Sequence, residues 1–175
     1  MFIPRRGKTI FTIINPLLAI AMKPNAYTQF YIHLVIAVKN REALLNGEIR
    51  PRICEYMSGI LTNLNHKSLI VNGISNHLHV FYGMNPNVSV SDTIHDLKRS
   101  SSLFINQNKL CKFNFSWQEG YGGFSYSKSQ VESVYKYILE QEKHHEKKTF
   151  REEYIDFLRK YDIAFNTNYL FDFFE

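Results

Sequence analysis

Cysteine is scarce in this chain of 175 residues, and Cys54 and Cys111 form no CxxC pair. Two isolated cysteines exclude a disulfide framework and a cysteine-based zinc site, so we expect a reducing, cytoplasmic location. The apolar run from Ile10 to Ala21 is too short to span a bilayer, and no membrane partner is expected. A strong excess of one charge is lacking too. The net charge of +5 permits a phosphate-bearing partner without requiring one.

The remaining composition is that of an ordinary folded protein. Hydrophobic residues make up 45% and charged residues 21%, which excludes disordered, collagen-like and coiled-coil proteins. The length suits one globular domain with a short appendage. Aromatic residues are frequent, with 14 Phe and 11 Tyr.

The first 21 residues stand apart from the rest. Arg5 and Arg6 precede the short apolar run, which gives the segment the superficial pattern of a signal peptide. Three explanations are open: translation from a true start at Met22, a docked extension, or a targeting signal. The first is the simplest. We therefore divide the chain into an extension (1–21), one domain (22–163) and an acidic, aromatic tail (164–175).

The pattern of apolar residues predicts four strands and four helices. β-Branched and aromatic runs predict strands at 30–38, 68–71, 77–82 and 117–127, the middle two forming a hairpin. Helical spacing predicts helices at 51–65, 91–106, 129–148 and 149–160, the third with Ser129 as N-cap and Glu132 completing a capping box. The order βαββαβ predicts an α+β, ferredoxin-like (RRM-like) fold: an antiparallel sheet with helices on one face and extra C-terminal helices. We expect the other face to be exposed and free to bind a ligand.

Two histidines separated by one residue form the first candidate site. His77 and His79 lie at positions i and i+2 of a predicted strand, so their imidazoles point to the same face. Neutral imidazole is a common metal ligand. The pair alone is weak evidence, because the chain has 7 histidines and two such residues can simply lie on an exposed sheet.

A tyrosine and a glutamine form the second candidate site. Tyr137 and Gln141 are four residues apart, so they share one face of the predicted third helix, whereas Tyr135 projects elsewhere. The Gln141 carbonyl oxygen suits a hard cation such as Mg²⁺ or Mn²⁺. A phenol can act as a covalent nucleophile, and a metal ion polarises a phosphoryl oxygen. Together the four residues predict attack by Tyr137 on a phosphodiester.

The sequence resembles the single-tyrosine HUH transposases of the insertion-sequence-200 type. The resemblance covers about residues 26–163 and is carried by five segments in order: 27–35, 76–80 with the His-Leu-His motif, 97–101, 117–125 and 134–145. It implies that His77, His79 and Gln141 bind the metal and that Tyr137 is the nucleophile. It further implies a transposase that cleaves single-stranded DNA with hairpins through a 5′-phosphotyrosine intermediate. The resemblance also implies a homodimer, in which the tyrosine helix of one subunit often completes the active site of the other.

Further polar residues have weaker assignments. Lys98 and Arg99 are candidate DNA-phosphate contacts, with a solvated helix face as the alternative. His144 lies seven residues after Tyr137 and is a candidate to approach the metal, whereas His145 is expected at a solvated or DNA-facing basic end. His33 receives no functional role.

Two other functions remain open. A hairpin-binding protein without catalysis would keep the fold but would not need the Tyr137–Gln141 pair. A metal-dependent phosphoesterase with a water nucleophile would need a general base beside the histidines, and the sequence places none there.

Overall fold

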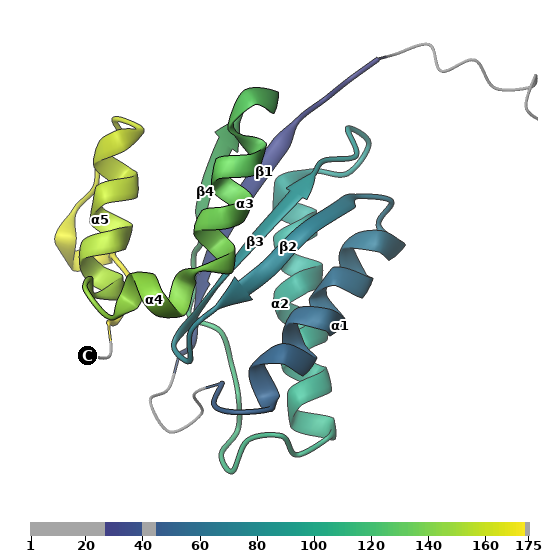
Figure 1. Ribbon diagram of the computed structural model, residues 1–175. Coiled ribbons are helices and arrows are strands. Elements are labelled where there is room, and N and C mark those ends of the chain that lie inside the picture. Colours follow the sequence, from purple (N-terminus) through teal and green to yellow (C-terminus); the bar gives the residue numbers. More distant parts are fainter. Residues whose placement is uncertain (1–26, 40–44, 174–175) are drawn as a thin grey trace, which may run out of the picture.

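The computed structural model describes residues 27–39 and 45–173 (Figure 1). The expectations for residues 1–21 and for a start at Met22 fall outside these residues. The predicted α+β fold with an antiparallel sheet is confirmed. No helix in the two described ranges is both long and apolar enough to cross a membrane.

The sheet has four antiparallel strands in the order β2-β3-β1-β4. The strands are β1 (Tyr31–Ala37), β2 (Lys67–Gly73), β3 (His77–Gly83) and β4 (Gly122–Tyr126). The predicted hairpin of β2 and β3 is confirmed. The last strand is shorter than predicted. Gly120 has a φ of +73°, which interrupts the extended backbone, and Trp117 makes only an isolated bridge to Val38.

Two helices cover one face of the sheet, α1 (Ile49–Asn63) and α2 (Val90–Gln107) (Figure 1). The Ser89 side chain caps α2 by accepting a hydrogen bond from the Asp92 backbone N–H. Alternate residues of β1 and β3, such as Leu34 and Val80, point to these helices. They form the main core with apolar residues of both helices, including Ile53 and Leu97.

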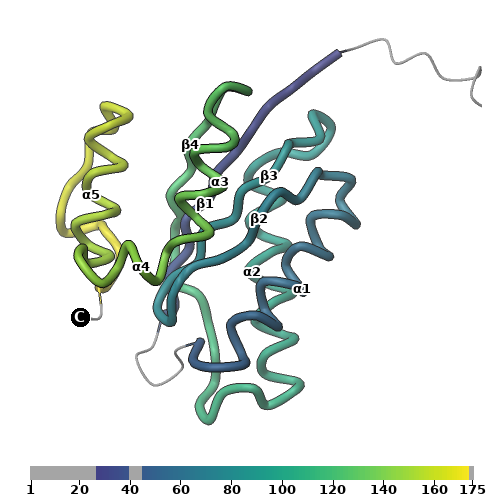
Figure 2. Tube along the Cα trace, in the orientation of Figure 1, coloured from purple at the N-terminus to yellow at the C-terminus, as the bar shows by residue number. Residues whose placement is uncertain are grey.

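The C-terminal helices cover the opposite face of the sheet. These are α3 (Val131–Leu139), α4 (Gln141–His145) and α5 (Phe150–Lys160), with short 3₁₀ turns at Lys128–Gln130 and Thr167–Tyr169. Figure 2 shows α3 in front of the sheet and α5 beside it, joined through α4. Phe81 packs with α3, and Val35 packs with α5. The expectation of an exposed binding face is therefore wrong, because these helices bury it.

The third predicted helix is divided. Its capping box uses Ser127 and Gln130 at the preceding 3₁₀ turn instead of Ser129 and Glu132. The helix stops at Leu139 and resumes as α4. The Asn72 side-chain amide donates hydrogen bonds of 2.9 and 3.2 Å to the carbonyls of Ile138 and Leu139. These carbonyls are thus held by the sheet at the point where the helix axis turns.

The aromatic tail packs against α5. Phe171 lies in one cluster with Phe150 and Tyr154. The Gln118 side chain binds the tail backbone from both sides: its Nε2 donates to the Asp172 carbonyl and its Oε1 accepts from the Asp172 N–H, each at 2.7 Å. This clamp joins the segment before β4 to the end of the chain.

Candidate active site

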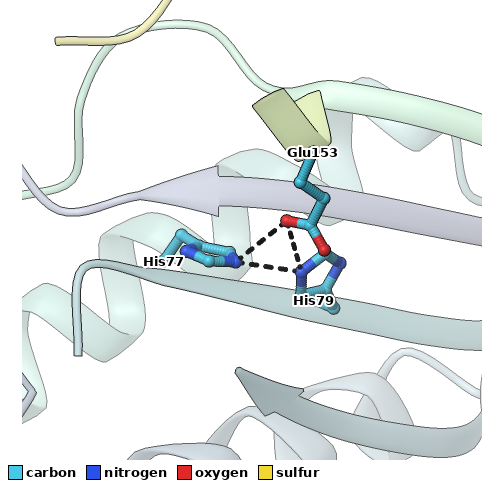
Figure 3. Close-up of side chains that lie close together, drawn as sticks. All are labelled: His77, His79 and Glu153. Carbon is cyan, nitrogen blue, oxygen red and sulfur yellow. Dashed lines mark hydrogen bonds and ion pairs between the residues drawn. The ribbon is translucent and has the colours of Figure 1, made fainter. Parts of the chain in front are cut away.

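His77 and His79 lie side by side on β3, beneath α5. Their side chains share one face of the sheet, as the spacing predicts, and their Nε2 atoms are 3.1 Å apart (Figure 3). Both are 0% exposed. The expectation that they stand on an exposed face is wrong, because Phe150 stacks on the His77 ring at 3.9 Å and Phe157 lies over His79.

Glu153 completes this group and was not identified from the sequence. It projects from α5 toward the two histidines (Figure 3). Its Oε2 atom lies 3.2 Å from His77 Nε2 and 3.4 Å from His79 Nε2. A signal exists in the sequence: Glu153 occupies an apolar-stripe position of an amphipathic helix, between Phe150 and Phe157. A carboxylate at such a position is buried only if it is paired.

The Glu153 carboxylate is ionised despite its burial. Burial by itself raises the pKa of a carboxyl group. The electrostatic effect of His79, followed by the close imidazoles of His145 and His77, outweighs this effect and holds the pKa of Glu153 well below its usual range. Burial also lowers the pKa of His77 to about 4, against the opposing pull of Glu153, so this imidazole is neutral near pH 7. The site therefore combines a neutral imidazole at His77 with a fixed negative charge.

The Tyr137 hydroxyl meets the other oxygen of the same carboxylate. It donates a hydrogen bond to Glu153 Oε1, and its ring stands edge-on to His79 with centroids 6.0 Å apart. Burial first, and then the charge of Glu153, raise the pKa of Tyr137. Tyr135 is instead 41% exposed. The predicted separation of the two tyrosines is thus observed.

Gln141 contacts the candidate active site by a hydrogen bond to Glu153. Its side chain is fully buried, and its Nε2 donates to Glu153 Oε1 at 3.0 Å. Its Oε1 accepts from His145 Nε2 at 3.1 Å. The spacing of four residues still brings Gln141 beside Tyr137, although the helix breaks between them.

Two histidines of α4 surround the carboxylate. His144 Nε2 lies 3.6 Å from Glu153 Oε1, in agreement with its expected approach to the site. His145 was expected at a solvated end, and this is wrong: its side chain is 7% exposed, with Nε2 3.4 Å from Glu153 Oε2. The turn at Glu140 redirects α4, so that His145 faces the site while Lys143 remains exposed.

His33 and Asn76 orient the paired imidazoles. Asn76 Oδ1 lies 2.8 Å from His77 Nδ1 and can only accept, so His77 Nδ1 carries the proton and Nε2 presents a lone pair. His33 Nε2 lies 2.8 Å from His79 Nδ1. With His79 Nδ1 as the donor there, the His79 Nε2 lone pair also faces Glu153. His33, to which the sequence assigned nothing, therefore supports the site from β1.

The donor set fits a divalent cation. One ligand atom from each of His77, His79 and Glu153 lies within 4.8 Å of the others. Among the described residues, Glu153 Oε2 is buried without a hydrogen-bond partner. Two imidazole lone pairs and a carboxylate oxygen that converge at this distance repel one another, and a cation between them removes the repulsion.

Lys98 and Arg99 lie on α2, across the sheet from this site. Lys98 Nζ donates to the carbonyls of Gln118 (2.8 Å) and Gly120, and burial lowers the pKa of Lys98 to about 8. Its ammonium thus stabilises the loop before β4. Arg99 is exposed.

The sequence of residues 26–141 matches the family model described as "Transposase IS200 like". The chain belongs to the IS200-like transposase family. The match covers about two thirds of the chain, and the family predicted from the sequence is confirmed. It includes the two histidines of β3, Tyr137 and Gln141, but ends before Glu153. This family member therefore supplies the buried carboxylate from a helix beyond the matched segment.

Two solved structures share the fold. A candidate transposase from Deinococcus radiodurans R1 has 18% identity and a TM-score of 0.55, covering 69% of this chain and 96% of the other. The REP-associated tyrosine transposase, solved bound to a REP hairpin, has 12% identity and a TM-score of 0.52, covering 71% and 74%. At these identities the likeness shows the fold alone. No curated protein sequence matches the chain significantly.

Proposed function

We propose that this IS200-like family member nicks and rejoins single-stranded DNA at the ends of an insertion sequence, with Tyr137 as the nucleophile. The observation that carries the proposal is the single carboxylate of Glu153, which contacts the Tyr137 hydroxyl through one oxygen and the His77–His79 pair through the other. A phenol beside a cation-binding group is the arrangement that attack on a phosphodiester requires.

The proposed cleavage step exchanges one phosphoester bond for another, with Tyr137 as the attacking group. The Tyr137 oxygen attacks the phosphorus of a phosphodiester and loses its proton to water, while Glu153 Oε1 accepts the hydrogen bond that holds the hydroxyl in place beforehand. A 5′-phosphotyrosine bond forms, the bond from phosphorus to the 3′ oxygen breaks, and that oxygen takes a proton from water and leaves as a 3′-hydroxyl. Attack by another 3′-hydroxyl reverses the step and joins strands. Because one phosphoester replaces another, no nucleotide hydrolysis is needed.

His77, His79 and Glu153 would hold the metal, and Gln141 would add its oxygen after a rotation of the amide, because that oxygen here accepts from His145. Mg²⁺ or Mn²⁺ suits a set that contains carboxylate and amide oxygens, and it would neutralise charge on the scissile phosphate. His33 and Asn76 keep the imidazole lone pairs directed at that position. Gln141 already touches Glu153 and lies next to the phenol.

Hairpin recognition and assembly belong to the same proposal. The REP-associated transposase with the same fold is bound to a hairpin, which supports a hairpin-bearing strand as substrate. Exposed Arg99 is a proposed phosphate contact on the face away from the nucleophile. Lys98 is a second one, although its ammonium already donates to the carbonyls of Gln118 and Gly120. A homodimer is expected from the family resemblance, while a single chain already brings Tyr137 to its own histidines.

A water-dependent phosphodiesterase is the second candidate. The sequence offered no general base beside the histidines, but the structure places Glu153 there. In this alternative Glu153 would take a proton from water, and Tyr137 would serve only to bind the carboxylate.

The decisive experiment compares two tyrosine variants on a hairpin-bearing single strand from the DNA flanking the gene. We expect Tyr137→Phe to bind the strand normally but to form no denaturant-resistant protein–DNA adduct, because its ring remains while the attacking oxygen is lost. Tyr135→Phe should still form the adduct. Strand cleavage by Tyr137→Phe without an adduct would favour the water mechanism. Loss of the adduct in Tyr135→Phe alone would instead identify Tyr135 as the nucleophile.

A further inference from the structure

A hollow of about 330 Å³ opens beside the Tyr137 ring, between α3 and α5. Three aromatic rings contribute to its walls: Tyr126 at the end of β4, Phe157 of α5 and Tyr137 itself. Val134 adds a further apolar wall, and Ser133 lines the hollow from the exposed side of α3. Glu153 also lines it, so the hollow adjoins the candidate active site.

We propose that this hollow binds one unpaired nucleobase, that of the nucleotide next to the scissile phosphate. The proposal rests on the proposed function and names a part of its substrate. The volume lies at the lower end of small-ligand pockets, about 300–1,000 Å³, which suits a single nucleotide unit rather than a longer segment. Aromatic walls bind bases by stacking, whatever the sequence.

The aromatic walls are held in place before any ligand arrives. Phe157 stacks on Phe124 with ring centroids 4.9 Å apart, and Tyr126 stands edge-on to Tyr161 at 5.8 Å. Tyr137 meets Phe157 edge-on at 5.8 Å. A base that enters therefore does not need to order these rings, which lowers the cost of binding.

Two acids, Glu153 and Asp156, and two lysines, Lys148 and Lys160, line the hollow, so its formal charges balance. Asp156, a second lining acid, pairs with Lys148, so that this lysine is already engaged. A hollow whose lining charges balance and whose walls include three aromatic rings suits an uncharged base.

The strand has room to continue past the phenol. A second, larger hollow of about 870 Å³ shares Tyr137, His144, Lys148 and Asp156 with the first. Its lining includes the cations Lys143, Lys147 and Arg159 and also the acids Glu140 and Glu152. With a base in the smaller hollow, the adjoining phosphate reaches the Tyr137 oxygen, and the next phosphates lie near these cations.

The test introduces a bulky side chain into the hollow at an exposed position of its lining. Ser133→Trp places an indole in the hollow without altering the buried core, and Glu132→Trp puts the same ring on the neighbouring exposed position of α3, outside the lining. Both are made in the Tyr137→Phe background, so that no chemistry occurs. The probe is the hairpin-bearing single strand flanking the gene, and binding is measured by fluorescence anisotropy, with circular dichroism as the folding control.

We expect Ser133→Trp to weaken binding of the single strand about tenfold, the size of one lost stacking contact. Glu132→Trp should bind within about twofold of its parent. A strand with 5-iododeoxyuridine beside the cleavage site should photocrosslink to Tyr126 or Phe157. Equal affinity of both tryptophan variants, with crosslinks only outside the hollow, would overturn the proposal. So would saturation of the hollow by free deoxynucleoside monophosphates that leaves strand binding and crosslinking unchanged.

These outcomes are independent of the adduct assay. The proposed function fails when wild-type protein forms no adduct with Tyr137, whatever the crosslinks show. The base pocket fails when Ser133→Trp, made separately with Tyr137 intact, forms the adduct normally and the crosslinks lie elsewhere.

Discussion

Glu153 is the residue at which the contacts of the site meet. One oxygen accepts from Tyr137 and from Gln141, and the other faces the imidazoles of His77 and His79. A buried carboxylate with such neighbours is costly unless its charge is balanced. The packing of α5 on the sheet therefore depends on the same side-chain contacts that form the candidate active site.

Metal binding should depend on this carboxylate and on both histidines of β3. We expect Glu153→Gln, His77→Ala and His79→Ala each to lower Mn²⁺ affinity by at least tenfold and to abolish nicking, because each removes a donor atom. Calorimetric titration with Mn²⁺ and a nicking assay measure the two effects. Hairpin binding should fall much less, since phosphate contacts dominate it. Wild-type nicking rates in both alanine variants would disprove the metal site.

His66 should make the fold sensitive to mild acid. Its Nδ1 accepts the Asn85 backbone N–H at 2.9 Å, and burial lowers its pKa below 6.5. Between the two pKa values the unfolded chain binds more protons than the folded one, so stability falls as the pH drops below about 6.5. We expect the free energy of unfolding to decline less steeply from pH 7 to pH 5 in His66→Gln than in the wild type. Parallel declines in urea titrations would contradict this role.

At the scale of elements, α5 is the helix that carries Glu153 and holds it over the histidines of β3. It begins with a capping box, in which Thr149 Oγ1 accepts from the Glu152 N–H and the Glu152 carboxylate accepts from the Thr149 N–H. Its apolar stripe covers β1 and β4, and Glu153 lies within that stripe. The cap thus helps to hold the carboxylate over the histidines.

Removal of this cap should weaken both the fold and the site. We expect Thr149→Ala to lower the free energy of unfolding by about 1 kcal/mol, the usual cost of a lost N-cap, and to reduce Mn²⁺ affinity. Urea denaturation and calorimetry provide the two readouts. Thr167→Ala, at an exposed position outside α5, is the control and should stay within about 0.5 kcal/mol of the wild type. A similar loss in both variants would argue against a specific role of the cap.

At the scale of the whole molecule, the sheet ends in two edge strands, β2 and β4. β2 carries a register shift between Ser68 and Ile70, and the Tyr161 hydroxyl donates to the Ser125 carbonyl of β4. These features partly protect the edges, but a sheet of four strands still offers backbone groups for pairing with a second copy.

We expect the protein to be a dimer at micromolar concentration, since an open antiparallel sheet can merge with its twin and the family resemblance implies such merging. Light scattering coupled to size-exclusion chromatography measures the mass directly. An active protein that remains monomeric throughout this range would exclude the dimer as a requirement.

The local pattern of the sequence determined the family, the order of the elements and the pairing of residues near one another in the chain. Strand periodicity placed His77 and His79 on one face, and helical spacing brought Tyr137 beside Gln141, because both depend only on backbone geometry. Tertiary structure alone decided that α5 returns over β3, which brings Glu153 to the site from 74 positions beyond His79. No local periodicity specifies such a long-range contact. It depends on how the apolar stripe of one helix packs on the sheet, and that packing also buried the face expected to be open.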